Sequence, residues 1–247
     1  MVALHGTAAA PGEIALTLVL LAYNEEDNVQ PAVERCLTAL RRLGVTHELI
    51  VVNDGSTDRT PDILESLARK HEAIRLIHNP INLNVGISVL LGMRAARGRI
   101  VTHNSMDLPF DPDEIARLLP LFDRADVVVV VRTGRTAHSP WRKVTSFVHH
   151  WIVRLLFWID VRDMNFVQAY RREVLESLTV KAKSPAFVTP ELIIRARRAN
   201  YRFAEIEAEF HRRKAGVANF GKSRDILWTL ADMLSFWLEG TKGDASR

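Results

Sequence analysis

The sequence contains a single cysteine, no long uncharged apolar run and no low-complexity segment in its 247 residues. One thiol, Cys36, excludes an internal disulfide framework and suits a reducing compartment. A membrane-spanning helix needs about 18 consecutive apolar residues, and the most apolar stretch, 144–159, is interrupted by Arg154. No basic segment precedes the first apolar run, at 14–22, so we expect no signal peptide and a cytoplasmic protein.

The remaining composition is that of an ordinary globular protein. Apolar residues make up 47% of the chain and charged residues 25%, which excludes wholesale disorder. Residues 1–131 carry 12 basic and 17 acidic side chains, a net charge of −5, whereas residues 132–247 carry 21 and 12, a net charge of +9. This asymmetry indicates either an anionic partner for the second half or a solvated basic face. Nucleic acid is disfavoured because no ladder of stacking aromatics accompanies the charge.

Short apolar runs alternate with helical patterns through the first half of the chain. The runs predict strands at 16–21, 48–53, 75–78, 99–103 and 126–131. Thr60, as the helix N-cap before Pro61, predicts the start of one intervening helix, and a capping box formed by Asp111 and Glu114 predicts the start of another. Strands and helices at this rhythm predict an α/β fold with a largely parallel sheet.

The second half is richer in amphipathic segments. We predict helices at 144–159 and 223–238, a helix opened by Thr189 and Pro190, and an alternating strand at 203–210. The two apolar helices suit either the core or a membrane surface, and we favour the membrane surface because tryptophans and arginines accompany them. The expected organisation is one domain over residues 14–222, followed by an amphipathic helix and tail over 223–247.

Three polar segments directly follow predicted strands, namely 21–26, 52–58 and 103–107. Asp-Gly-Ser by itself is usually only a turn. Because the carboxyl ends of parallel strands share one edge of the sheet, where ligands bind, we expect the three segments to converge on one cleft.

These segments carry a family resemblance. Ala22-Tyr23-Asn24-Glu25-Glu26, followed by Val51-Val52-Asn53-Asp54-Gly55-Ser56-Thr57-Asp58, resembles the inverting GT-A glycosyltransferases of family 2. Asn84-Val85-Gly86, Gly92 and Ala95-Ala96-Arg97-Gly98 are similar to the pattern that precedes the metal-binding strand of that family. Arg213-Lys214-Ala215-Gly216 is similar to the branch containing dolichol-phosphate mannose synthase and the bacterial polyprenyl-phosphate glycosyltransferases. The resemblance covers 14–238 and implies a GT-A sheet flanked by helices, with a nucleotide-sugar half at 14–131 and an acceptor half at 132–222.

The resemblance implies a donor pocket for a nucleotide sugar, formed by Ala22, Tyr23, Asn24, Glu25, Asp54, Gly55, Ser56 and Asp107. Asp54 is expected to hydrogen-bond the edge of the base, and uracil and guanine both fit that role. Asp107 matches the last carboxylate of the family's Asp-x-Asp motif, which holds Mg²⁺ or Mn²⁺ on the donor diphosphate. Ser105 replaces the first aspartate and Pro109 a glutamine, so the resemblance predicts a weakly bound cation that depends on the donor or on basic side chains.

The resemblance also implies an acceptor, a polyprenyl phosphate bound by Arg132, Arg142 and Arg213 at a membrane surface, with Arg213 also among the catalytic residues. A lipid phosphate is already anionic and requires no strong general base. A hydroxyl acceptor, such as a metabolite or glycan, would require a positioned carboxylate, for which Glu191 is the first candidate and Asp163 the second. A non-catalytic nucleotide-sugar-binding protein with a degenerate metal motif is a further alternative.

Overall fold

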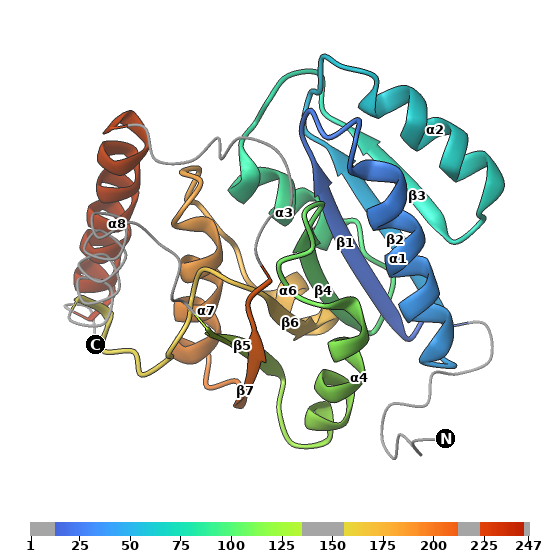
Figure 1. Cartoon of the computed structure of the whole chain (residues 1–247). Coiled ribbons are helices and arrows are strands. Elements are labelled where there is room, and N and C mark those ends of the chain that lie inside the picture. Colours follow the sequence, from blue (N-terminus) through green and yellow to red (C-terminus); the bar gives the residue numbers. More distant parts are fainter. Residues whose placement is uncertain (1–12, 135–155, 212–222, 245–247) are drawn as a thin grey trace.

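The chain builds one seven-stranded sheet with helices on both faces (Figure 1). The computed structural model describes residues 13–134, 156–211 and 223–244. The strand order is β3-β2-β1-β4-β6-β5-β7, and β6 alone runs antiparallel to its neighbours β4 and β5. The strands are β1 (Leu16–Ala22), β2 (His47–Asn53), β3 (Ile74–His78), β4 (Ile100–Ser105), β5 (Val127–Thr133), β6 (Gln168–Arg171) and β7 (Phe203–Glu209). The α-helices are α1 (Val29–Arg42), α2 (Thr60–Lys70), α3 (Val85–Arg94), α4 (Ile115–Leu118), α6 (Arg172–Ser177), α7 (Val188–Arg198) and α8 (Ser223–Asp244).

The central strands are apolar at nearly every position because both of their faces are covered. Along β1, Leu16, Leu18 and Leu20 join the core beneath α1, α2 and α4, whereas Val19 joins the opposite core beneath α3, α6 and α7. Strand β5 divides its valines between the same two cores. Continuous apolar runs of this kind are typical of strands buried on both faces, and the predicted α/β fold with a mostly parallel sheet is confirmed.

Two glycines of the Asn84–Gly98 segment allow close packing against the sheet. A Cβ on Gly92 would lie 2.3 Å from Val19 Cγ1, so α3 packs directly on β1 only without a side chain there. A Cβ on Gly98 would lie 2.5 Å from the backbone nitrogen of Thr17. The glycines therefore set how closely α3 and the start of β4 approach the central strand.

The predicted N-cap Thr60 was wrong, whereas the predicted N-cap Asp111 is confirmed without the Glu114 half of its capping box. Helix α2 begins at Thr60 itself, and Arg59 precedes it without a capping side chain, because the Thr60 hydroxyl accepts a hydrogen bond from the backbone N–H of Glu25 instead. At 112–114 the chain forms a single 3₁₀ turn capped by the carboxylate of Asp111. Glu114 pairs with Arg117, so the contact expected of a capping box is replaced by a surface ion pair.

Candidate donor-binding site at the carboxyl edge of the sheet

The segments that follow β1, β2 and β4 lie at one edge of the sheet, as predicted. Residue Leu21 is paired with Ser105, and Ala22 with Asn53. Beyond the strands, Met106 N–H donates to the carbonyl of Leu21 at 3.1 Å, and Asp54 N–H donates to the carbonyl of Ala22 at 2.8 Å. Strands β1, β2 and β4 therefore end at paired positions of the sheet, and the polar residues that follow them lie next to one another.

The loops after β1 and β2 are joined by side-chain hydrogen bonds. Asn24 has a positive φ of 52°, and its backbone N–H donates to Ser56 Oγ at 3.0 Å. In return, the backbone N–H of Thr57 donates to Asn24 Oδ1 at 2.8 Å. Glu25 N–H donates to Thr60 Oγ1 at 2.9 Å. The motif residues Asn24, Glu25 and Ser56 therefore hold two loops together whether or not they also contact a ligand.

Asp58 adds a further link between these loops. Its Oδ1 accepts from Thr60 N–H at 3.0 Å and its Oδ2 from Glu26 N–H at 3.2 Å. Burial acts to raise the pKa of Asp58, but the hydrogen bonds from Thr60 and Glu26 outweigh burial and hold that pKa below its usual value. Asp58 is therefore a charged clamp, a role that the sequence motif did not reveal.

Asp54, the first residue after β2, is buried, with 4% of its surface exposed. Its Oδ1 accepts from Asn79 Nδ2 at 3.0 Å and from Leu83 N–H at 2.8 Å. Gly55, with φ of +69°, is required next to it because a Cβ there would lie 2.4 Å from the carbonyl carbon of Ile81. Asn79 was not predicted from the sequence, although its place directly after β3 matches that of Asp54 after β2.

The end of β4 presents Ser105 and Asp107 at the same edge, both partly exposed. In the described residues no group of three or more His, Cys, Asp and Glu side chains has the arrangement of a metal site. One carboxylate and one hydroxyl therefore fit a divalent cation only if further oxygens come from the donor.

His103 is not part of this edge. Its side chain is buried, and Nε2 lies 3.1 Å from Gln168 Oε1 on β6. Burial lowers the pKa of His103 to about 4, against a smaller raising effect of the Gln168 hydrogen bond. His103 is therefore a neutral core residue.

Arg132, expected to bind the acceptor phosphate, is paired within the chain. Its Nε and Nη2 donate to Asp163 Oδ2 and Oδ1 at 2.7 and 2.9 Å, and its guanidinium lies 5.1 Å from the Phe166 ring centroid. The Arg132 side chain is 20% exposed and that of Asp163 only 2%. This bidentate pair fixes the position of Arg132 beside the end of β5.

Glu191, the first candidate base, is buried at the start of α7 with 1% of its surface exposed. Its carboxylate accepts from the backbone N–H groups of Lys181 and Ala182 and from Arg195 Nε at 2.6 Å. The other predicted residues of the acceptor half, Arg142 and Arg213, lie outside the described residues.

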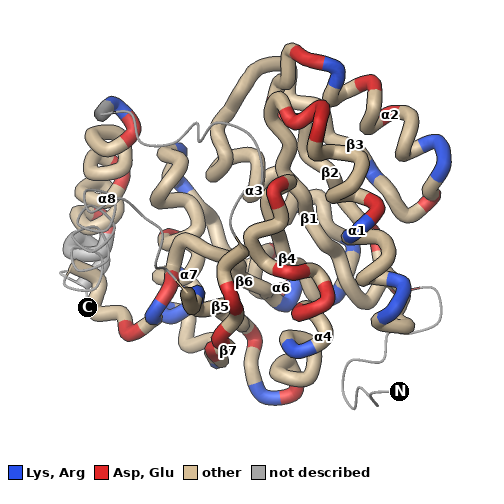
Figure 2. Tube along the Cα trace, in the orientation of Figure 1, with Lys and Arg blue, Asp and Glu red and all other residues tan. Residues whose placement is uncertain are grey.

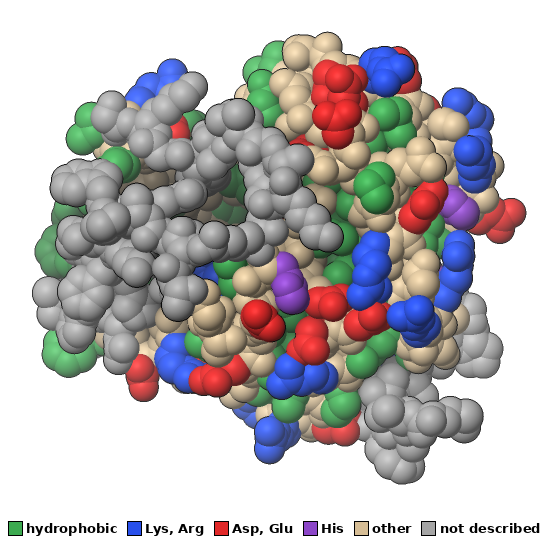
Figure 3. Space-filling view, viewed as in Figure 1, with side chains coloured by type: hydrophobic (Ala, Val, Ile, Leu, Met, Phe, Trp, Pro, Cys, Tyr) green, Lys and Arg blue, Asp and Glu red, His purple; other side chains and the backbone are tan. Residues whose placement is uncertain are grey.

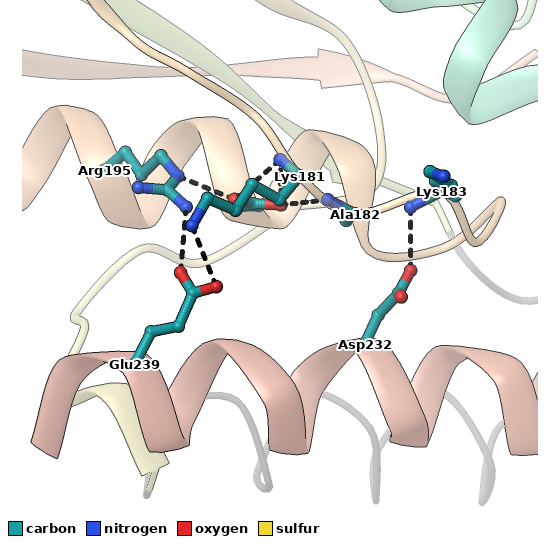
Figure 4. Close-up of polar contacts among 7 residues, drawn as sticks. Lys181, Ala182, Lys183, Arg195, Asp232 and Glu239 are labelled. Carbon is teal, nitrogen blue, oxygen red and sulfur yellow. Dashed lines mark hydrogen bonds and ion pairs between the residues drawn. The ribbon is translucent and has the colours of Figure 1, made fainter. Parts of the chain in front are cut away.

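Helix α8 lies beside α7 and the loop that precedes it, and Asp232 and Glu239 reach across to them (Figure 4). Asp232 Oδ2 accepts from the backbone N–H groups of Lys183 and Ser184 at 2.8 and 2.7 Å. Glu239 pairs with Lys181 at 3.0 Å, and Met233 and Phe236 are buried between these contacts. A small pocket between α7 and α8 contains none of the predicted donor-binding residues.

The opposite side of α8 is apolar and exposed, and part of it is visible along the left edge of Figure 3. Its exposed residues are Ile226, Leu227, Leu230, Leu234, Trp237 and Leu238. In the described ranges, no helix combines the length and apolar character needed to cross a membrane.

Comparison with known sequences matches residues 17–179 to the family model described as "Glycosyl transferase family 2". Dodecaprenyl-phosphate galacturonate synthase of Rhizobium johnstonii is 26% identical over 236 residues, covering 94% of this chain and 69% of that protein. Undecaprenyl-phosphate 4-deoxy-4-formamido-L-arabinose transferase of Pectobacterium atrosepticum is 32% identical over 167 residues, 66% of this chain. The match spans only half of that second relative.

The fold is also similar to solved structures. Glucosyl-3-phosphoglycerate synthase from Mycobacterium tuberculosis, crystallised with Mn²⁺, uridine diphosphate and phosphoglyceric acid, superposes with a TM-score of 0.67 at 21% identity. The superposition covers 92% of this chain and 79% of the other. At this identity the likeness establishes the GT-A fold.

Proposed function

We propose that this chain, which belongs to glycosyl transferase family 2 and is a glycosyltransferase, transfers one sugar from a nucleotide-sugar donor to a polyprenyl phosphate. The transfer is expected to invert the anomeric carbon. The relatives from Rhizobium johnstonii and Pectobacterium atrosepticum, both named for polyprenyl-phosphate substrates, support this acceptor class.

The state of the two candidate bases is the observation that carries the proposal. Glu191 is enclosed by N–H donors, and Asp163 is paired with Arg132. Both carboxylates are buried and engaged by donors of the protein, so neither is presented to a substrate hydroxyl group as a general base must be. A lipid phosphate needs no such base, so these contacts favour an acceptor that arrives as an anion over the hydroxyl-acceptor alternative.

For the donor, we propose that the pocket over Ala22–Glu25 and Asp54–Ser56 binds the nucleoside. Asp107 and Ser105 would hold Mg²⁺ or Mn²⁺ together with the diphosphate oxygens. The cation would offset the negative charge that develops on the leaving nucleoside diphosphate. We propose that Arg132, held by Asp163 beside the end of β5, shares in charge stabilisation or binds the acceptor phosphate, and that Arg142 and Arg213 have the same phosphate-binding role.

The reaction is tested by incubating the purified chain with a panel of nucleotide sugars and undecaprenyl phosphate, with and without EDTA. Mass spectrometry of the lipid fraction should show one glycosylated lipid phosphate, reduced at least about tenfold by Asp107→Asn. Asp123→Asn, which lies away from the sheet edge, is the matched control and should retain activity. If the chain binds a nucleotide sugar but forms no glycolipid with any donor, the proposal is overturned and the non-catalytic alternative is favoured. If the chain glycosylates only a hydroxyl acceptor, the hydroxyl-acceptor alternative is favoured instead.

A further inference from the structure

Asn84, the residue before helix α3, has a backbone conformation that is unusual for a residue with a side chain. Its φ is 77° and its ψ is 160°, a combination that is essentially confined to glycine. Backbone strain of this kind persists only where the surrounding structure holds it in place, and it is concentrated at ligand sites and switch regions. The contacts that hold Asn84 therefore indicate which parts of the chain depend on it.

The Asn84 side chain joins helix α3 to the loop at 181–184. Its Oδ1 accepts from the backbone N–H of Gly86 at 3.0 Å and so caps α3. Its Nδ2 donates at 3.0 Å to the carbonyl of Lys183, 99 residues further along the chain. The start of α3 also lies close to this loop, because a Cβ on Gly86 would lie 3.1 Å from the carbonyl oxygen of Ser184. Both groups of the Asn84 amide are therefore engaged, one within α3 and one across to the loop.

The loop at 181–184 is held in turn by helix α8. Asp232 Oδ2 accepts from the backbone N–H groups of Lys183 and Ser184 at 2.8 and 2.7 Å (Figure 4). Lys183 therefore has one backbone hydrogen bond to α8, through its N–H, and another to Asn84, through its carbonyl. A displacement of α8 moves the group that accepts from Asn84.

On its other side, Asn84 follows a segment that packs against the candidate donor site. The backbone N–H of Leu83 donates to Asp54 Oδ1 at 2.8 Å, and a Cβ on Gly55 would lie 2.4 Å from the carbonyl carbon of Ile81. The loops that follow β2 and β3 are therefore in close backbone contact. Because Leu83 and Asn84 are consecutive, a change in the φ and ψ of Asn84 shifts the Leu83 N–H relative to Asp54.

We propose that Asn84 and Asp232 are positioning residues of the donor site, through which helix α8 holds the loop at 54–58 in its nucleotide-binding geometry. The inference rests on the proposed nucleotide-sugar function and on a donor pocket at the carboxyl edge of the sheet. Release of the loop at 181–184 from α8 lets Asn84 relax to an unstrained conformation, which shifts the loop at 54–58 and weakens donor binding. By the reciprocity of linked equilibria, donor binding in turn strengthens the attachment of α8.

The substitution Asn84→Asp breaks the contact with Lys183 and keeps the helix cap. Aspartate caps a helix as well as asparagine does, but an oxygen replaces the Nδ2 donor and faces the Lys183 carbonyl, which is also an acceptor. Asn200→Asp is the matched control, because it makes the same exchange at another residue of positive φ, 61°, exposed in the turn after α7. The two variants separate loss of the Lys183 contact from the general effect of an added carboxylate.

Calorimetric titration of the full chain with UDP, dTDP, GDP and CDP, each with Mn²⁺, measures the affinity of the donor site. For the nucleotide that binds most tightly, we expect Asn84→Asp and Asp232→Ala each to weaken binding at least about fivefold. The double variant should bind about as weakly as either single variant, because both substitutions break the same chain of contacts. Asn200→Asp should bind like the native chain. Unchanged affinity in either single variant, or losses that multiply in the double variant, would overturn the inference.

Hydrogen exchange followed by mass spectrometry gives a readout that a merely structural role of Asn84 would not change. Bound nucleotide should slow exchange at 181–184 and in α8 of the native chain at least about twofold. In Asn84→Asp, saturating nucleotide should slow exchange at 54–58 but no longer in α8. A nucleotide that slows exchange in α8 equally in both proteins would contradict the proposed connection.

The results separate this inference from the proposed function. If glycolipid forms while exchange in α8 does not respond to bound nucleotide, the glycosyltransferase proposal stands and this inference is wrong. If none of the four nucleotides binds the native chain, the result counts against both.

Discussion

His103 shows how a buried neutral side chain affects stability. Burial lowers its pKa to about 4, whereas the pKa of a histidine in the unfolded chain is about 6.5. Between these two values the unfolded chain binds a proton that the folded chain does not, so stability falls as the pH falls from about 6.5 toward 4. Above pH 6.5 this contribution is fully present.

We therefore expect His103→Gln to lose less stability in acid than the native chain. Urea unfolding measures the free energy of unfolding at pH 7 and at pH 5. From pH 7 to pH 5 this free energy should fall by roughly 2 kcal/mol less in the variant than in the native chain, because glutamine does not titrate. Comparing the pH dependence, instead of the stability at one pH, removes any constant effect of the substitution on packing. Equal acid losses in both proteins would show that His103 does not titrate as described.

Residues that pair over long sequence distances could not be predicted from local patterns. Arg132 was identified as a phosphate-binding candidate and Asp163 as a possible base, yet the two form one ion pair. No periodicity relates positions 31 residues apart, and each side chain looks like an independent functional group in the sequence. The same limit applies to Glu191, whose partners Lys181 and Ala182 come from a preceding loop.

At the scale of elements, the strands that carry the donor loops were predictable because burial on both faces imposes continuous apolar runs. Strand β6 was not, because it has only four residues and contains the buried polar side chain of Gln168. Its antiparallel place between β4 and β5 depends on the fold of the whole sheet. The buried amide of Gln168 is hydrogen-bonded at this position, because its Nε2 donates to the backbone carbonyls of Met164 and Phe166.

Polar contacts help to hold helix α8 on the rest of the fold, beside the buried side chains of Met233 and Phe236. Asp232→Ala would leave the N–H groups of Lys183 and Ser184 without their acceptor, at a cost of about 1–3 kcal/mol. Hydrogen exchange followed by mass spectrometry should show faster exchange in the loop at 181–184 and in α8, with little change in α1 and α2.

Leu234→Ala on the same helix is the matched control for that experiment, because Leu234 is 56% exposed and faces away from α7. It should leave exchange in the loop at 181–184 close to that of the native chain. Faster exchange in the control to the same degree would mean that α8 is held by its apolar side and not by Asp232.

At the scale of the whole molecule, the basic excess of the second half lies outside the described residues. Residues 132–134, 156–211 and 223–244 carry 12 basic and 12 acidic side chains, and Figure 2 shows the two kinds interspersed along the chain. Arg132, Arg162, Arg195 and Arg202 each pair with a carboxylate. The net charge of +9 in the second half therefore comes from the nine basic residues outside the described ranges. Arg142 and Arg213, proposed to bind the acceptor phosphate, are among those nine residues, whereas Arg132 is already paired with Asp163.

The apolar side of α8 supports the proposal that the enzyme works at a membrane surface. Leu227 is 68% exposed and Leu234 56%, and both lie on the side of the helix opposite its contacts with α7. Exposed apolar residues in one stripe, with tryptophans among them, are typical of helices that lie in a lipid interface. We expect the double substitution Leu227→Ser and Leu234→Ser to reduce sedimentation with anionic liposomes at least about tenfold, because the two leucine side chains no longer move from water into the lipid.

Ile81→Ser, which removes an exposed apolar side chain from the loop after β3, is the control and should sediment like the native chain. Unchanged sedimentation of the double variant would assign membrane contact to another part of the chain, whereas loss of its folded circular-dichroism spectrum would instead give these leucines a role in stability.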